Sequence, residues 1–280
     1  MECWSSLSNE IDTGMRYIFV ILILAFWGCN KVTQQSMYVQ KSNTTLSPPS
    51  ISVDEAFFNI QTLIRVNDVD PKINIRYTID ETEPTQNSPL AKKHIIVSET
   101  GIYKFKAFQK EIKSSNTVSI ETIEARKVNW IGLESNDPNE TYNSGISVLT
   151  DHKKGDWNFR SDEWYGYQDS IVQFSFILEE GEVVNGAVVS TMIDQNSWIF
   201  SPENVRLTYH FEDGHKEKHE LSIPDCIVQS KKQMNYLKIT TPPRYPKKID
   251  ITVYNMLSIP DWHSGKGLKP WLFVDEILVL

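Results

Sequence analysis

Tryptophan residues beside Gly, Pro, Asp or Asn are the side chains of this sequence best suited to ligand chemistry. Such neighbours are typical of turns, so these rings are expected at or near loops. A flat indole ring can cover the C–H face of a sugar while polar neighbours hydrogen-bond its hydroxyls. The candidate carbohydrate-binding residues are the rings Trp164, Trp198, Trp262 and His263, with the polar groups Asp194, Asn196 and Asp261.

The same rings could instead fill the core of a β-sheet protein. Trp198-Ile199-Phe200 and Trp271-Leu272-Phe273 alternate as strand residues do, which favours burial of Trp198 and Trp271. Trp262 lies in the glycine-rich run Asp261–Gly267, which favours an exposed ring there. For Trp164 the core and the binding surface both remain open alternatives.

Composition excludes several classes of protein. The 280 residues suffice for two domains, and 40% hydrophobic residues support well-filled cores. The net charge of −8 argues against nucleic acid as a partner, because phosphate binding needs clustered Lys and Arg. The three cysteines, Cys3, Cys29 and Cys226, suggest neither a disulfide framework nor a cysteine metal cluster.

The first 29 residues have the pattern of an export signal. Tyr17 to Trp27 is a short apolar run behind Met15-Arg16, and Met15 is the expected true start. Gly28-Cys29 resembles a bacterial lipoprotein cleavage site, which implies lipid attachment at Cys29. An uncleaved anchor is the alternative. Either would place the chain in the bacterial cell envelope, with the outer membrane expected, on the periplasmic or outer face. Residues 30–49 predict a polar linker.

The remainder of the chain predicts an all-β fold with at most one or two short helices. Period-two alternation over Ile73–Ile79 and Tyr103–Phe108 indicates strands of a first domain spanning residues 50–126. A second domain spans residues 127–280. Its expected strands cover residues 171–178, 183–193, 205–211, 249–253 and 272–280. Long loops between these strands are typical of a jelly-roll sandwich that carries its site on loops.

The first domain resembles the chitobiase/β-hexosaminidase C-terminal domain, an immunoglobulin-like accessory module. The resemblance rests on a Tyr-Thr-x-Asp turn at Tyr77–Asp80, on Pro84-Thr85 and on the strand Lys104–Phe108. Glu81 stands where the family has a turn glycine, which puts the geometry of that turn in doubt. The family implies a β-sandwich without catalytic residues.

The second domain resembles the galactose-binding-like (discoidin-like) domain that is often appended to bacterial hexosaminidases. The resemblance rests on five separated motifs that occur in one order: Leu149-Thr150-Asp151 with Gly155, Trp164–Tyr167, Ser197–Pro202, Asp261–Gly265 and Trp271–Ile277. It implies a jelly-roll β-sandwich and a structural Ca²⁺ bound by Asp151, Asp156 and Glu276. The alternative is that Asp151 caps a turn and Glu276 pairs with a nearby cation. No other cofactor is implied.

The acid pairs of the sequence do not predict an enzyme. Hexosaminidases use an Asp-Glu pair after a His-x-Gly-Gly pattern, whereas Asp162-Glu163 follows Arg160-Ser161. The catalytic barrel of these enzymes needs about 250 residues. The two β-domains predicted here already occupy most of the sequence. We therefore expect a non-catalytic envelope lipoprotein that binds glycans and contains no catalytic residue. The alternatives are a scaffold that docks an envelope protein partner, or an accessory fragment of a glycosidase.

Overall fold

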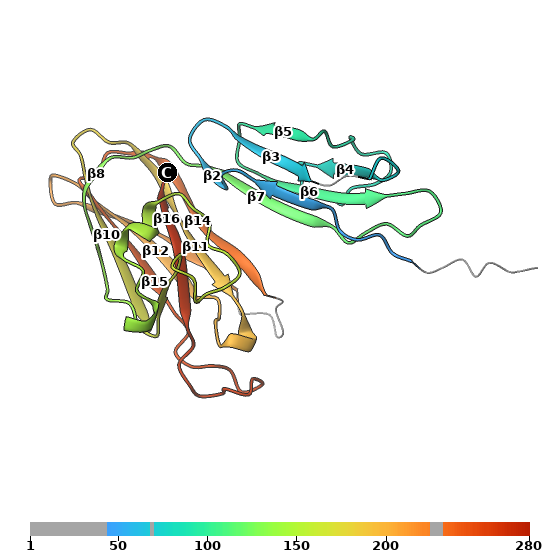
Figure 1. The fold of residues 1–280 in the computed structure, drawn as a ribbon. Coiled ribbons are helices and arrows are strands. Elements are labelled where there is room, and N and C mark those ends of the chain that lie inside the picture. Colours follow the sequence, from blue (N-terminus) through green and yellow to red (C-terminus); the bar gives the residue numbers. More distant parts are fainter. Residues whose placement is uncertain (1–43, 68–69, 225–231) are drawn as a thin grey trace, which may run out of the picture. The chain divides into compact units, whose positions relative to one another are not determined.

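The computed structural model describes residues 44–67, 70–224 and 232–280, which form β-sheets with short connecting helices (Figure 1). The predicted signal peptide, the lipid attachment at Cys29, most of the linker and Cys226 lie outside the described residues. No helix within the described ranges combines the length and apolarity that a bilayer crossing requires.

The first domain consists of a three-stranded and a four-stranded sheet. The three-stranded sheet has the order β1-β3-β5, and the four-stranded sheet has the order β2-β7-β6-β4. Its strands are β1 (Ser50–Val53), β2 (Phe57–Phe58), β3 (Thr62–Asn67), β4 (Asn74–Thr78), β5 (His94–Val97), β6 (Gly101–Phe108) and β7 (Val118–Glu124). Alternate residues of β3 and β6 are buried, and Ile64, Val97 and Phe105 meet in a core between the sheets.

The turn after β4 keeps the left-handed conformation that a glycine would adopt. Glu81 has φ 62°, and its carbonyl accepts a 2.6 Å hydrogen bond from Lys104 Nζ. Asp80 Oδ1 accepts hydrogen bonds from the backbone and the hydroxyl of Thr82, and the Thr78 hydroxyl donates to the Thr82 carbonyl. Glu81 therefore occupies a backbone conformation that favours glycine, at the cost of a strained residue.

The second domain is a sandwich of a five-stranded and a four-stranded sheet. The orders are β13-β12-β15-β10-β8 and β14-β11-β16-β9, and every pairing is antiparallel. The strands are β8 (Trp130–Ser135), β9 (Tyr165–Tyr167), β10 (Ile171–Leu178), β11 (Val184–Ile193), β12 (Asn204–His210), β13 (Lys216–Ser222), β14 (Gln233–Arg244), β15 (Lys248–Tyr254) and β16 (Leu272–Val279).

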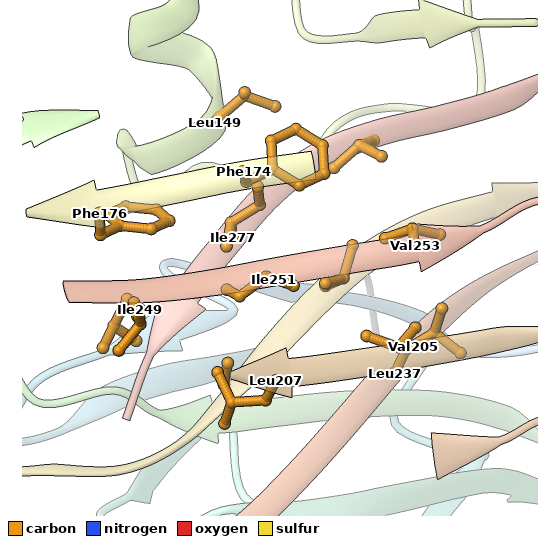
Figure 2. Close-up of a cluster of buried hydrophobic side chains, with 14 of the residues drawn as sticks. Leu149, Phe174, Phe176, Val205, Leu207, Leu237, Ile249, Ile251, Val253 and Ile277 are labelled. Atoms are coloured by element: carbon orange, nitrogen blue, oxygen red, sulfur yellow. The ribbon is translucent and has the colours of Figure 1, made fainter. Parts of the chain in front are cut away.

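The core of this sandwich lies between the inner faces of its two sheets. Figure 2 shows Phe174 and Phe176 of β10 with Ile249, Ile251 and Val253 of β15, all fully buried. Leu237 of β14 and Ile277 of β16 belong to the same cluster and come from the opposite sheet. Burial of this many large aliphatic and aromatic side chains supplies the main driving force for folding.

Strand β16 is buried along its whole length and contains a β-bulge at its centre. Ser190 of β11 pairs with Glu276 while the next residue, Thr191, pairs with Val274, so Asp275 has no partner in this ladder. The bulge reverses the alternation of side chains: Leu272 and Val274 face the core before it, and Ile277 and Val279 after it. Two consecutive acidic residues are thereby buried.

The predicted all-β fold is confirmed, and the five strands expected in the second domain match β10, β11, β12, β15 and β16 to within one residue. The expected number of helices was too low. The described residues contain three short 3₁₀-helices, η1 (Glu140–Tyr142), η2 (Ile146–Thr150) and η3 (Gln195–Ser197). Because each of them is at most five residues long, no helical periodicity could reveal them.

The substitution Glu81→Gly is expected to stabilise the first domain by about 0.5–1 kcal/mol, because it relieves a left-handed non-glycine residue. Urea denaturation of both proteins measures the change. Glu81→Ala serves as the matched control: it removes the side chain but keeps the strained Cβ, so it should bring no gain. Equal stabilisation by both variants would show that the side chain, not the backbone, is responsible.

Candidate carbohydrate-binding site

The segment around η3 forms a tight turn that exposes Trp198. The Asp194 and Ile199 backbones exchange two 3.0 Å hydrogen bonds, and Trp198 N donates to the Gln195 carbonyl. Trp198 itself adopts a left-handed conformation with φ 62°, and its side chain is 39% exposed. The expectation that alternation would bury Trp198 was wrong, because the residue ends a turn and does not continue a strand. Ile199 and Phe200 are fully buried.

A second loop, residues 259–268, places Trp262 on the same surface. The loop is closed by hydrogen bonds from Ile259 N to the Leu268 carbonyl and from Gly267 N to the Ile259 carbonyl. Trp262 is 41% exposed. Gly265 of this loop lies against the Trp198 indole so closely that a Cβ would come within 3.2 Å of it. In Figure 1 the gold turn near residue 195 and the orange loop near residue 260 lie at the same end of this sandwich.

The polar groups predicted for this site have different surroundings. His263 Nδ1 accepts a 3.0 Å hydrogen bond from Gly265 N, and the His263 ring lies edge-on to Phe200 and Trp262. Asp194 is almost fully buried; it accepts from the Ser197 hydroxyl and pairs with Lys232 at 3.1 Å. Asn196 and Asp261 are exposed. Asp194 therefore shapes the turn, whereas the two exposed groups are free to face a ligand.

Trp164 cannot form part of a binding surface in this structure. Its side chain is completely buried, and its indole N–H donates to the Asp156 carbonyl. A Cβ on Gly155 would lie 2.7 Å from the indole, so only glycine allows the loop to approach the ring. The prediction of Trp164 as a ligand-binding ring was wrong, because its polar neighbours pack over it and leave no face open.

A hollow of about 310 Å³ opens in the same domain, which the sequence did not predict. Its floor is Phe273, with Tyr142 4.9 Å and Phe159 5.2 Å away between ring centroids. Its remaining lining residues are Arg160, Asn196, Ser197 and Trp271. The only feature of the sequence that could have indicated this hollow is its aromatic residues, Tyr142, Phe159, Trp271 and Phe273, which come from separate segments of the chain.

Two local features position the rings of this hollow. Gly166 lies beneath them, and a Cβ there would come within 2.8 Å of Tyr142 and 2.9 Å of Phe273. Trp271 is paired with Ile199 in a parallel β-bridge, and the backbone N–H of Trp271 donates a hydrogen bond to the Trp198 carbonyl. The backbone that exposes Trp198 on one side therefore also holds Trp271 at the wall of the hollow on the other.

The loop preceding these rings is fastened to the centre of β16 by a buried ion pair. The Lys154 ammonium contacts Asp275 Oδ2, which also accepts a 2.7 Å hydrogen bond from Gly155 N. The ammonium lies 4.9 Å from the Trp164 ring and 5.7 Å from the Tyr236 ring. Burial lowers the pKa of Lys154, and the Asp275 charge opposes that shift.

The three residues expected to bind calcium are not equivalent. Glu276 Oε2 accepts a hydrogen bond from His152 N, while Oε1 is buried without a partner. Burial, together with the nearby Asp151 charge, raises the pKa of Glu276 to about 9. Asp156 instead accepts hydrogen bonds within its own turn, from Asn158 N and the Ser161 hydroxyl.

Glu276 thus offers a cation one buried, unpartnered oxygen. Asp151, like Asp156, accepts a hydrogen bond within its own turn, from Lys153 N, and it pairs with the Lys153 ammonium at 3.6 Å. Within the described residues no three His, Cys, Asp or Glu side chains converge on one point. A Ca²⁺ at Glu276 and Asp151 would therefore need backbone or water oxygens as additional ligands, which calcium accepts readily.

Comparison with known proteins confirms the identity of the first domain. Residues 54–119 match the family model of the chitobiase/beta-hexosaminidase C-terminal domain. No curated protein sequence is significantly similar to the chain.

Several solved structures match about half of the chain at low similarity. A Ruminococcus gnavus GH29 fucosidase in complex with fucose is 12% identical, with 53% of this chain and 24% of the fucosidase covered and a TM-score of 0.32. A Streptococcus pneumoniae fucose binding module is 11% identical, with coverages of 53% and 92% and a TM-score of 0.32. The lectin domain of lectinolysin, complexed with Lewis B antigen, is 8% identical, with coverages of 53% and 91% and a TM-score of 0.33. These similarities are too low to transfer a ligand.

Replacing Lys154 by Met should destabilise the second domain by about 3 kcal/mol, because it leaves the buried Asp275 carboxylate without a counter-charge. Adding Asp275→Asn to that variant should restore part of the loss, since an amide oxygen can still accept from Gly155 N–H. Urea denaturation compares the variants. The exposed neighbour Lys153→Met is the control and should change stability by less than about 0.5 kcal/mol. Equal effects at residues 153 and 154 would contradict the assignment.

Proposed function

We propose that this protein is a non-catalytic carbohydrate-binding lipoprotein of the bacterial cell envelope. The observation that carries the proposal is the pair of partly exposed indole rings, Trp198 and Trp262, on adjoining loops of the second domain. Exposed rings that lie together on one surface, unlike single exposed residues, can mark a contact site for a ligand or a partner. Asn196, Asp261 and His263 supply polar groups beside them.

Binding would combine ring stacking with hydrogen bonds to sugar hydroxyls. The apolar C–H face of a pyranose lies on an indole ring and removes apolar surface of both from water. Neighbouring amide, carboxylate and imidazole groups then select hydroxyls by their geometry. A single shallow contact of this kind is weak. Many copies anchored on one membrane would bind a polymeric glycan by avidity.

A non-catalytic role is supported by the surroundings of the acid pairs. Glycoside hydrolysis needs two carboxyl groups that face each other about 5–10 Å apart across an open site. Asp275 and Glu276 are buried within β16 and are adjacent in the chain, so they cannot flank a glycosidic bond. The carboxylate of Glu163 accepts a hydrogen bond from Asp156 N and supports a loop.

A protein partner is the second candidate for the same end of the domain. Leu257 is 74% exposed and Leu268 is 50% exposed, and they lie just before and at the end of the loop that carries Trp262. Exposed aliphatic side chains beside aromatic rings enlarge an apolar patch of the kind that docks a protein, whereas the sugar contact proposed above uses the rings and their polar neighbours. The two proposals therefore differ in whether substitution of Leu257 or Leu268 weakens binding.

The substitution Trp262→Ala is expected to weaken retention on immobilised glycans at least tenfold, or about 1.4 kcal/mol, without lowering the melting temperature. A glycan array followed by affinity electrophoresis measures this, and Trp198→Ala should behave in the same way. Leu268→Ala is the matched control and should leave glycan retention unchanged. Glycan retention that is unchanged in both tryptophan variants would disprove the assignment of this site. Loss of binding to a protein partner in Leu268→Ala would favour the second candidate.

We further propose that Glu276 and Asp151 hold a structural Ca²⁺, supported by the unpartnered buried Glu276 Oε1. At a calcium concentration 100 times Kd, binding should stabilise the fold by about 2.7 kcal/mol. That gain raises Tm by about 5–10 °C for a domain of this size. Calorimetry with calcium and with EDTA should show the shift in the wild type and in Asp156→Asn, but not in Glu276→Gln. A shift that persists in Glu276→Gln would place the ion elsewhere.

Attachment to the membrane through Cys29 is part of the same proposal and rests on the sequence. Metabolic labelling with radioactive palmitate should mark the wild-type protein and leave Cys29→Ser unlabelled, with the variant released into the soluble fraction. Cys226→Ser is the control for a cysteine of the same chain and should be labelled normally. Membrane retention of unlabelled Cys29→Ser would favour an uncleaved anchor.

A further inference from the structure

Arg160 lies at the rim of the hollow over Phe273 and has no acidic partner among the described residues. Its guanidinium is stacked on the Phe159 ring at 4.7 Å from the centroid. Four other arginines have their guanidinium groups paired with carboxylates: Arg65 with Asp54, Arg126 with Glu182, Arg206 with Glu220 and Arg244 with Glu217. Arg160 is therefore a cation whose fork of N–H donors remains available.

Stacking on Phe159 holds this guanidinium in place while leaving its donors free. A cation above a ring face is attracted by the ring quadrupole, and this contact uses none of the guanidinium N–H donors in a conventional hydrogen bond. Ordering of the long side chain before a ligand arrives reduces the entropy lost on binding. Arg160 is thus preorganised to bind a planar anionic group in two-point fashion, which a flexible lysine would not be.

The rest of the hollow has the character of a sugar site. Its volume of about 310 Å³ lies at the lower end of the range for small-ligand sites. Tyr142 and Trp271 are half-buried and cross each other at 81°, with 5.0 Å between centroids, so they form two walls of a corner. The exposed carboxamide of Asn196 also lines the hollow. Rings, one amide and one free cation are thus combined in one small space.

We propose that this hollow binds a carboxylate-bearing sugar residue of an acidic glycan. The proposal rests on the carbohydrate-binding function above and names its ligand class. The carboxylate would accept two hydrogen bonds from the Arg160 guanidinium, the C–H face of the ring would lie against Trp271 or Tyr142, and a hydroxyl would meet Asn196. Trp198 and Trp262 would contact neighbouring residues of the same polymer, since Asn196 and Ser197, which line the hollow, directly precede Trp198 in the chain.

Because the chain carries a net negative charge, a preference for an acidic glycan over a neutral one would indicate a specific contact. At a net charge of −8, the protein as a whole repels a polyanion, which disfavours non-specific adsorption. At 0.15 M salt, charges more than about 8 Å apart are largely screened. The difference in affinity between an acidic polymer and its neutral form therefore depends on cations close to the bound carboxylate. A preference for an acidic polymer over its neutral form would therefore report a specific contact.

The test uses the full chain in detergent, with polygalacturonic acid and its fully methyl-esterified form as probes. The two polymers share one sugar and differ in the charge of the carboxyl group. We expect the wild type to bind the acid at least tenfold more tightly than the ester by affinity electrophoresis. Arg160→Gln should lose that preference, and Arg160→Lys should recover only part of it. Lys266→Gln, which removes the same charge from the loop that carries Trp262, should retain it.

The outcomes separate this inference from the proposed function. If the wild type is retained on neutral glycans but binds acid and ester equally, the inference fails while the carbohydrate-binding function stands. If the wild type binds polygalacturonic acid through Arg160 and Trp198→Ala and Trp262→Ala change nothing, the inference holds and the two-tryptophan site fails. An acid preference that survives in Arg160→Gln, or is lost equally in Lys266→Gln, overturns the assignment of Arg160.

Discussion

The second domain depends on one buried charge. Asp275 sits at the bulge of β16, where the ladder leaves it without a partner and the surrounding strand excludes water. A carboxylate in such a place must be neutralised and hydrogen-bonded, or it would cost several kcal/mol. Lys154 and Gly155 N–H meet that requirement at Oδ2, while Oδ1 stays buried without a hydrogen-bond partner. These two contacts hold the loop over residues 151–164 against the sheet. Trp164 is then packed beneath the lysine, and Phe159 and Arg160 follow at the rim of the hollow.

Backbone conformation, more than residue type, decides what each tryptophan does. Trp164, Trp198 and Trp271 all stand near polar or turn-forming residues, yet the first is fully buried, the second exposed and the third half-buried. The left-handed conformation of Trp198 places its ring toward solvent. The β-bridge between Ile199 and Trp271 holds Trp271 beside the aromatic rings of the hollow. Glycines 155, 166 and 265 then allow the backbone to approach the rings closely.

Sequence reasoning was strong where the signal is local and periodic. Period-two alternation over Ile73–Ile79 and Tyr103–Phe108 predicted β4 and β6 to within two residues, and the motifs from Tyr77 to Phe108 pointed to the family that residues 54–119 match. It failed where the deciding contact is distant. Nothing near Lys154 shows that its partner is Asp275, and nothing near Arg160 shows that the residue lies beside Asn196 and Trp271. The alternation that suggested a strand at Trp198 also could not reveal a left-handed residue.

The separation of Gly155 and Asp275 by 120 residues has a kinetic consequence. Contacts of such high sequence separation close large loops, so they form late and make folding of a β-sandwich slow. The aromatic hollow cannot exist before this closure, because its lining residues come from three segments, 142–160, 196–197 and 271–273. A partly folded chain would therefore have much of its sheet structure but no hollow. Assembly of the hollow would appear during refolding only in the last and slowest phase, and would report completion of the fold more strictly than strand content does.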